Sequence, residues 1–104
     1  MSASESEYGV PFPGREVPRE RWTTTGLRDP GGAFDWNAVF GREAPRVVDL
    51  GCGNGRFLIG SALARPGFDH FGVDTVQVAI DYAAQRANRR GLANVRFVVG
   101  DAVV

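Results

Sequence analysis

Hydrophobic and polar residues follow a regular pattern only from residue 46 onward. Three short runs rich in valine and phenylalanine are typical of buried β-strands. Two longer segments lie between these runs, and their apolar residues recur at the three- to four-residue spacing of a helix packed on one side. The pattern predicts β-α-β-α-β, with strands at 46–50, 70–74 and 94–99 and helices at about 54–65 and 76–90.

Local capping signals support these boundaries. Asn54 is a suitable cap for the first helix, and Pro66-Gly67 ends it. Gly91 stands where a glycine cap would end the second helix. The residues expected to face the core are Phe57, Leu58, Ala62 and Leu63 in the first helix and Val76, Ala79, Ile80, Ala83 and Ala87 in the second.

The order of the elements predicts an α/β fold with a parallel sheet. Right-handed crossovers place the three strands side by side in the order 3-2-1. After Arg46, the run at 46–50 is apolar except for one carboxylate, so we expect this strand to be covered on both faces. The chain then divides into a partial Rossmann-like domain at 46–104 and an irregular leader at 1–45.

The leader is rich in proline and glycine, and one short helix is expected at 34–40, with Asp35 as its cap. Arginines surround Trp22, as in segments that hold single-stranded RNA. However, residues 1–45 contain five arginines against seven acids. A loosely ordered leader that packs Trp22 and Trp36 against the domain is therefore at least as well supported as an RNA-binding arm.

The whole chain of 104 residues is electrically balanced, with twelve arginines, no lysine and twelve acids. This balance gives no general attraction to nucleic acids or membranes. No apolar run reaches the roughly 18 residues of a membrane span, and the acidic N-terminus does not resemble a signal peptide. Cys52 is the only cysteine, so neither an internal disulfide nor a CxxC metal site is expected. A cytoplasmic protein without a metal is the simplest interpretation.

Three glycines separate the first strand from the first helix. Gly51, Gly53 and Gly55 form a G-x-G-x-G loop at the carboxyl end of a parallel strand, where open α/β sheets bind nucleotides. A dinucleotide-binding loop would need G-x-G-x-x-G, but Arg56 occupies its last position. The loop therefore favours a ligand other than a dinucleotide. A nicotinamide or flavin site and a purely structural turn remain as alternatives.

Carboxylates stand at or near the carboxyl ends of all three predicted strands: Asp49, Asp74 and Asp101. These strand ends converge on the ligand crevice of an open α/β sheet. Asp74 follows Gly51 by 23 residues, about where an acid binds the ribose hydroxyls in nucleotide-binding units. Each aspartate alone could be a turn or helix cap, but three at successive strand ends favour a shared site.

The spacing of glycines and acids resembles motif I of the S-adenosylmethionine-dependent methyltransferases with the Rossmann-like fold. More specifically, the chain is similar to the bacterial tRNA (guanine-N7)-methyltransferases. The similarity covers about residues 46–102 and rests on three segments: Leu-Gly-Cys-Gly-Asn-Gly-Arg-Phe-Leu at 50–58, Phe-Gly-Val-Asp at 71–74, and Gly-Leu-Ala-Asn-Val-Arg-Phe-Val-Val-Gly-Asp-Ala at 91–102.

This resemblance implies that the chain binds S-adenosylmethionine through the glycine loop and the strand-end acids. Asp74 would bind the ribose, while Asp101 and Ala102 would bind the adenine. Asp49 would order the glycine loop or face the methionine amino group. Many members of the family have glutamate in place of Asp49 and Asp74, which is a mild departure. The implied cofactor-binding residues are Asp49, Gly51, Gly53, Gly55, Asp74, Asp101 and Ala102.

The resemblance further implies methyl transfer to N7 of a guanine in tRNA, with tRNA as the partner. Residues 46–104 carry a net charge of +2, and three arginines near the end of the second helix are candidates for phosphate contacts. A solvated helix face is the simpler interpretation of this cluster. The three arginines are Arg86, Arg89 and Arg90.

Family members continue for four more strands and carry an Asp-Pro-Trp-Pro stretch, which this sequence does not match. We therefore expect the chain to be a fragment whose catalytic residues lie elsewhere. The strand at 46–50 would expose an apolar edge, to be covered by a C-terminal half or by a dimer partner. A non-catalytic S-adenosylmethionine-binding or interaction module, and a methyltransferase acting on a small molecule or protein, remain as alternatives.

Overall fold

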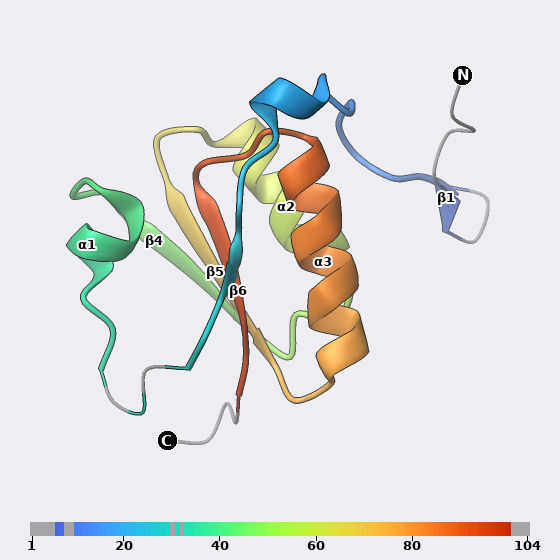
Figure 1. The fold of residues 1–104 in the computed structure, drawn as a ribbon. Coiled ribbons are helices and arrows are strands. Elements are labelled where there is room, and N and C mark those ends of the chain that lie inside the picture. The colour runs from blue at the N-terminus through green and yellow to red at the C-terminus, as the bar shows by residue number, and fades with distance from the viewer. Residues whose placement is uncertain (1–5, 8–9, 30, 32, 101–104) are drawn as a thin grey trace.

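The computed structural model describes residues 6–7, 10–29, 31 and 33–100. Four parallel strands form its main sheet in the order β3-β6-β5-β4 (Figure 1). The predicted strand order 3-2-1 is confirmed, because it corresponds to β6-β5-β4. The strands are β3 (Gly26–Leu27), β4 (Arg46–Leu50), β5 (Asp69–Asp74) and β6 (Val95–Val99).

Two helices cover one face of this sheet, namely α2 (Arg56–Ala64) and α3 (Gln77–Arg89). Both lie close to their predicted ranges. Gly91, with φ of 65°, follows the end of α3, where its N–H donates to the carbonyl of Asn88. The glycine cap predicted there is therefore confirmed. The core between helices and sheet includes Leu58, Ile59, Ala62, Ile80, Ala83, Ala87, Val95 and Phe97.

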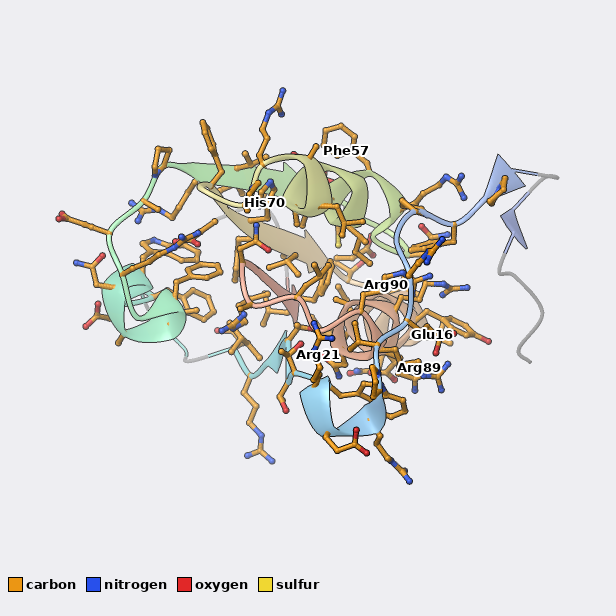
Figure 2. All side chains as sticks on the ribbon, turned by 90° about the horizontal axis from the view of Figure 1, so that it is seen from above. Glu16, Arg21, Phe57, His70, Arg89 and Arg90 are labelled. Carbon is orange, nitrogen blue, oxygen red and sulfur yellow. The ribbon has the colours of Figure 1, made fainter. Side chains whose placement is uncertain are left out.

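The inward face of α2 differs in part from its prediction. Phe57 is 67% exposed and Leu63 is 39% exposed, so both were wrongly placed in the core, and Figure 2 shows Phe57 pointing away from the sheet. The buried stripe instead joins Leu58 and Ala62 with Ile59, which is fully buried. The apolar residues of this helix fit two overlapping stripes, and only the packed sheet selects between them.

The start of each helix also differs from the sequence pattern. Val76 precedes α3 as its cap and is half exposed, so it was wrongly assigned to the buried face. Gly55, rather than Asn54, occupies the cap position of α2. The side chain of Asn54 still accepts a hydrogen bond from the N–H of Arg56 at 3.2 Å. A left-handed glycine thus begins the helix, and the asparagine supports its first turn.

The opposite face of the sheet is covered by aromatic side chains from the leader. The predicted short helix is α1 (Trp36–Phe40), and the side chain of Asp35 caps it by accepting from the N–H of Ala38. Trp36 and Phe34 pack on Phe71 of β5, with ring centroids 4.5 and 5.0 Å away. The expected packing of Trp36 against the domain is confirmed.

Strand β4 forms one edge of the sheet, and β5 is its only pairing partner among the described strands. Its residues alternate between exposed and partly buried, and Val48 and Leu50 are 52% and 61% exposed. The expectation that this strand is covered on both faces is therefore wrong for the described residues. The expected exposed apolar edge is present.

The leader contributes β3, an element that the sequence pattern did not predict. This two-residue strand pairs in parallel with β6 and is held by the fully buried Thr25 just before it. The hydroxyl of Thr25 lies 2.8 Å from the side-chain oxygen of Asn88 and 3.2 Å from the carbonyl of Ala84, both on α3. The N–H of Thr25 also donates to Asn88. Side-chain hydrogen bonds to α3 therefore fix the leader to the sheet.

The remaining leader elements lie upstream of this contact. They are the short antiparallel pair β1 (Ser6–Glu7) and β2 (Val10–Pro11) and the 3₁₀ turn η1 (Arg19–Arg21). Trp22 follows η1 and stays partly exposed, with the guanidinium groups of Arg19 and Arg89 over its ring.

A buried histidine joins α2, β5 and the segment before β6 at the amino ends of the strands. The Nδ1 of His70 lies 3.2 Å from the carbonyl of Asn94, which can only accept, so Nδ1 carries the proton. The Nε2 atom then accepts from the hydroxyl of Ser61 at 2.9 Å. Burial lowers the pKa of His70 below its ordinary value of 6.5. The contact in which Nε2 accepts thus requires the neutral ring.

Replacing Thr25 with valine should destabilise the chain by about 0.5–1.5 kcal/mol, because its hydroxyl would no longer donate to the side-chain oxygen of Asn88 or the carbonyl of Ala84, and only its N–H would still bind Asn88. The matched control is Thr24→Val, since Thr24 is exposed in the same segment and should tolerate the change. Urea unfolding of both variants measures the difference. Equal stability of the two variants would show that the leader is not held by this contact.

His70 should make the chain less stable as the pH falls below 6.5. The folded state binds a proton on His70 less readily than the unfolded state, so its contribution is complete above 6.5 and is lost toward the lowered folded pKa. Urea midpoints measured between pH 8 and 5 should therefore fall more steeply for the unmodified chain than for His70→Asn. Parallel profiles would contradict this assignment.

Candidate functional site

The site predicted from the sequence lies at the carboxyl ends of the strands, where the glycine loop connects β4 to α2. The loop is tied to the neighbouring strand, because the N–H groups of Gly51 and Cys52 both donate to the carbonyl of Val73, at 2.7 and 3.1 Å. The N–H of Gly55 closes the turn on the carbonyl of Cys52. These bonds fix the loop against the end of β5.

Two of the loop glycines have distinct structural roles. Gly55 has φ of +79°, and a Cβ atom on it would stand 2.8 Å from the Cβ of Ala83 on α3. This glycine therefore allows the helices to pack closely. Gly53 has φ of +56° and open space where a Cβ would stand, so its backbone is accessible to a ligand.

Asp74 connects the glycine loop to the start of α3. One oxygen of its carboxylate, Oδ2, accepts from the N–H of Gly53, and Oδ1 accepts from the N–H of Val76, each at 2.9 Å. These backbone donors, from Val76 and then Gly53, lower the pKa of Asp74 below its ordinary value. Asp74 is therefore a stable anion that orients the loop.

Asp49 and Cys52 share this edge of the sheet. Burial, followed by the charge of Asp74, raises the pKa of Asp49 above its ordinary value. Burial and the same two carboxylates raise the pKa of Cys52 to about 12, so its thiol is not an activated nucleophile. The electrostatic environment of the site thus disfavours further negative charge and favours a cationic group.

The end of β6 completes the described part of this edge. The N–H of Gly100 donates to the carbonyl of Asp74 at 3.0 Å. The structure thereby brings together Asp49, Asp74 and the three loop glycines, as the sequence predicts. The other two predicted residues, Asp101 and Ala102, lie outside the described residues.

Sequence reasoning missed one residue at this edge. The Oδ2 atom of Asp29 lies 3.6 Å from the position that a Cβ on Gly100 would occupy. Asp29 comes from the leader, two residues after β3. No sequence signal identified β3, so nothing placed this aspartate beside the strand ends.

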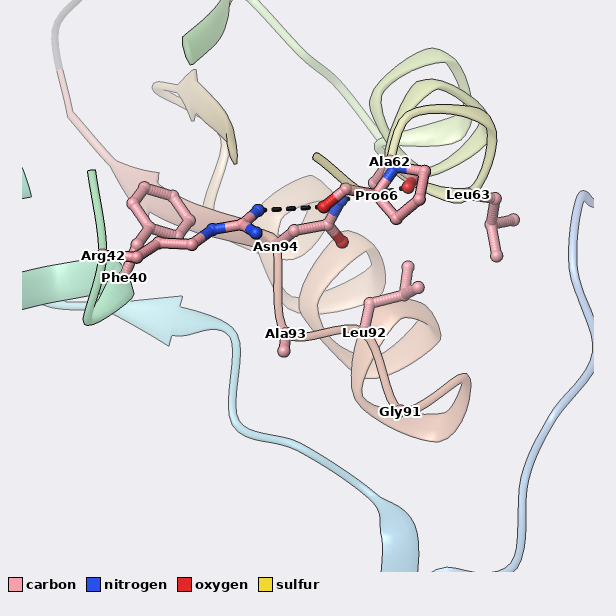
Figure 3. Close-up of a pocket in the computed structure, with 9 residues that line it drawn as sticks. All are labelled: Phe40, Arg42, Ala62, Leu63, Pro66, Gly91, Leu92, Ala93 and Asn94. Carbon is pink, nitrogen blue, oxygen red and sulfur yellow. Dashed lines mark hydrogen bonds between the residues drawn. The ribbon is translucent and has the colours of Figure 1, made fainter. Parts of the chain in front are cut away.

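A cavity of about 430 Å³ lies at the other end of the sheet (Figure 3). Arg42 stands beside it, donating to the carbonyl of Pro66 and pairing with the buried carboxylate of Asp69 at 2.7 Å. Its walls precede the strands rather than follow them, so it is separate from the glycine loop. The cavity is lined by Phe40, Arg42, Ala62, Leu63, Pro66, Gly91, Leu92, Ala93 and Asn94.

The arginines near the end of α3 anchor the leader. Arg90 is only 6% exposed, and its Nε donates to the carbonyl of Pro13 at 2.8 Å. The guanidinium groups of Arg86 and Arg90 each lie 4.8 Å from the ring centroid of Phe12, which is buried. Figure 2 shows Arg89 and Arg90 on the side where the leader passes. Packing against the leader therefore explains the positions of Arg86 and Arg90 without a phosphate contact.

In the described part of the chain, no helix is long and apolar enough to cross a membrane. Over the same residues, no three histidine, cysteine, aspartate or glutamate side chains are grouped to hold a metal ion.

Comparison with known proteins identifies the fold family. A family model described as a methyltransferase domain matches residues 42–103, which include the glycine loop and all three strand-end acids. The chain belongs to this methyltransferase family. The match contains the predicted strand, loop and helix pattern, so the resemblance noted from the motifs is confirmed.

Several curated relatives are named tRNA (guanine-N(7)-)-methyltransferase. The relative from Leifsonia xyli is 38% identical over 81% of this chain, and that from Methylococcus capsulatus is 43% identical over 79%. The relative from Nocardia farcinica is 32% identical over 99% of this chain, so its match includes the leader. The chain spans 37%, 35% and 39% of these relatives, which is little more than a third of their length.

Solved structures confirm the partial Rossmann-like fold. An antibiotic-related methyltransferase matches 67% of this chain and 37% of its own length, with 26% identity and a TM-score of 0.57. The antibiotic-resistance methyltransferase Kmr matches 64% of this chain and 36% of its own, with 34% identity and a TM-score of 0.58. The family is thus established by fold and sequence together.

Gly55→Ala should destabilise the chain by about 2–4 kcal/mol, because it adds left-handed strain and a clash with Ala83. Gly67→Ala is the matched control, since a Cβ there meets nothing within 4 Å. Urea unfolding at one pH measures both. A loss no larger than that of Gly67→Ala would show that the loop and α3 are not closely packed at Gly55.

Proposed function

We propose that this chain forms the S-adenosylmethionine-binding part of a tRNA (guanine-N7) methyltransferase. The observation that carries the proposal is the Asp74 carboxylate, which fixes a G-x-G-x-G loop at the carboxyl end of a parallel sheet. The relatives' names supply the tRNA and guanine part of the proposal. A further structural neighbour, PKMT2 from Rickettsia typhi, was solved in complex with AdoHcy, with 26% identity and a TM-score of 0.52.

The geometry of the loop is suited to a close-fitting ligand. A Cβ on Gly51 or Gly53 would meet nothing within 4 Å, so a ligand can approach the backbone there. Oδ1 of Asp74 accepts from the N–H of Val76 and Oδ2 from the N–H of Gly53, and a carboxylate has about four acceptor positions, so it has capacity left for a ribose hydroxyl. Asp101 and Ala102 are proposed to hold the adenine, as the resemblance implies.

The electrostatics also suit this cofactor. The pKa of Asp49 is raised first by burial and then by the negative charge of Asp74, which repels that of Asp49. S-adenosylmethionine carries a sulfonium and an ammonium group, and either positive charge would relieve this repulsion. We therefore assign Asp49 to the methionine end of the cofactor, where it either faces the amino group or orders the loop.

Little acid–base chemistry is needed for the proposed reaction. Guanine N7 is a lone-pair acceptor, so it requires no deprotonation before it attacks a methyl group. The cofactor would supply the methyl group, and the glycine loop and Asp74 would hold the cofactor in a fixed orientation. Well-oriented reactants gain about 7–11 kcal/mol over a bimolecular encounter. The role proposed for this chain is binding and orientation.

We assign recognition of the target base to the part of the longer relatives that this chain does not match. In this proposal residues 46–104 supply the first half of the cofactor-binding domain, and the leader adds β3 to it. The exposed side chains of Val48 and Leu50 along β4 would be covered by a C-terminal half or a dimer partner. tRNA is the proposed substrate and the cytoplasm the proposed location.

A second candidate function is a non-catalytic S-adenosylmethionine-binding module. It is favoured by the roles of the glycine loop and Asp74, since both are assigned to binding and orientation and neither to methyl transfer. Cofactor binding without methylation of tRNA would support it. Methylation of a small molecule or protein instead of tRNA would support the third alternative, since the fold is shared by methyltransferases with other names.

Asp74→Asn should weaken binding of S-adenosylmethionine roughly 5- to 150-fold, the equivalent of about 1–3 kcal/mol. The amide nitrogen cannot accept a hydrogen bond, so one of the backbone donors and one ribose hydroxyl would lose a partner. Isothermal titration calorimetry of the 104-residue chain measures the effect. Asp81→Asn is the control, since Asp81 lies on the exposed face of α3.

Thermal unfolding of Asp74→Asn separates lost binding from lost folding. A folded variant that binds as well as Asp81→Asn would overturn the assignment of Asp74 to the cofactor.

A further inference from the structure

The leader brings a side chain to the carboxyl edge of the sheet. Gly26 and Leu27 pair with Phe97 and Val98 of β6, and the same register continued by two residues sets Asp29 opposite Gly100. The 3.6 Å distance from Asp29 Oδ2 to the Cβ position of Gly100 agrees with this register.

The groups along this edge form a continuous row across the strand ends. The glycine loop after β4 bonds to Asp74 through the N–H of Gly53. The carbonyl of Asp74 then accepts from the N–H of Gly100 after β6. Asp29, after β3, lies next to Gly100 and is the outermost member of the row.

The segment that carries Asp29 is held from both sides. Thr25 bonds to Asn88 and Ala84 on α3, and its carbonyl accepts from the N–H of Phe97 at 2.8 Å. Leu27 packs on the opposite face of the sheet. In Figure 1, β3 runs beside β6 toward the same end of the sheet. Asp29 therefore has a defined position relative to the strand ends.

We propose that Asp29 is a specificity-determining residue that accepts a hydrogen bond from the 6-amino group of the cofactor's adenine. This inference rests on the proposed function, which places the methionine end at the glycine loop, the ribose at Asp74 and the adenine at the end of β6. The next group along the row beyond the adenine position is the carboxylate of Asp29.

The chemistry of the two carboxylate oxygens supports this role. Oδ1 of Asp29 accepts from the N–H of Gly31 at 2.8 Å, which fixes the side chain, while Oδ2 is the atom beside Gly100. A carboxylate can only accept hydrogen bonds. Adenine presents an amino donor at its 6-position, whereas hypoxanthine presents a carbonyl oxygen there. Asp29 thus selects adenine over hypoxanthine.

Asp29→Asn tests this role directly. The oxygen of the asparagine can still accept from the N–H of Gly31, while its amino group, a donor, replaces Oδ2. The 104-residue chain is titrated calorimetrically with S-adenosylhomocysteine and with S-inosylhomocysteine. We expect the variant to bind the adenosyl compound about tenfold more weakly and the inosyl compound more tightly than the unmodified chain does. Glu20→Gln is the control, since Glu20 is an exposed leader acid in η1.

The outcomes separate this inference from the function on which it rests. If the unmodified chain binds neither compound, the proposed function fails and the inference with it. If the unmodified chain binds the adenosyl compound and Asp29→Asn leaves both affinities unchanged, the inference alone is overturned. An equal loss of both affinities would also overturn it, because a structural role does not distinguish an amino group from a carbonyl.

Discussion

The arrangement of the site depends on one carboxylate and its backbone donors. The carboxylate of Asp74 accepts from the N–H of Gly53 in the loop and from the N–H of Val76 at the start of α3, so one side chain joins the glycine loop, β5 and α3. The main chain repeats this connection, since the carbonyls of Val73 and Asp74 bind the loop and the end of β6. The strand ends are therefore fixed relative to one another before any ligand arrives, which reduces the free energy that binding must spend on ordering them.

The leader is part of the same framework. A buried threonine, Thr25, aligns β3 beside β6 through its hydrogen bonds to α3. Arg90 adds a second attachment through the carbonyl of Pro13. The leader, although rich in proline and glycine, thus adds one strand to the sheet and places Asp29 at its carboxyl edge.

Whether a feature could be predicted from the sequence depends on how far apart along the chain its interacting residues lie. β4 was predicted to the residue and β5, β6 and α3 to within one, because apolar periodicity and the glycine at 91 act locally. The glycine loop and Asp74 were predicted because their spacing along the chain encodes their position. β3, Asp29 and the outward rotation of Phe57 were not, since each depends on partners far along the chain. Local propensity carries no information about such partners.

The two sides of the site differ in polarity: one is bordered by hydrogen-bonded polar groups and the other by exposed apolar side chains. Toward β6 and β3 the strand ends are bordered by bonded groups, from Asp74 to Asp29. Toward β4, by contrast, Leu50 and Phe57 are largely exposed. Under the proposed function, the first side would hold the ribose and adenine of the cofactor, and the glycine loop on the second side would hold its methionine end. Under the proposed function, the residues that recognise the guanine must therefore approach across β4, and the apolar surface there is the surface on which they would pack.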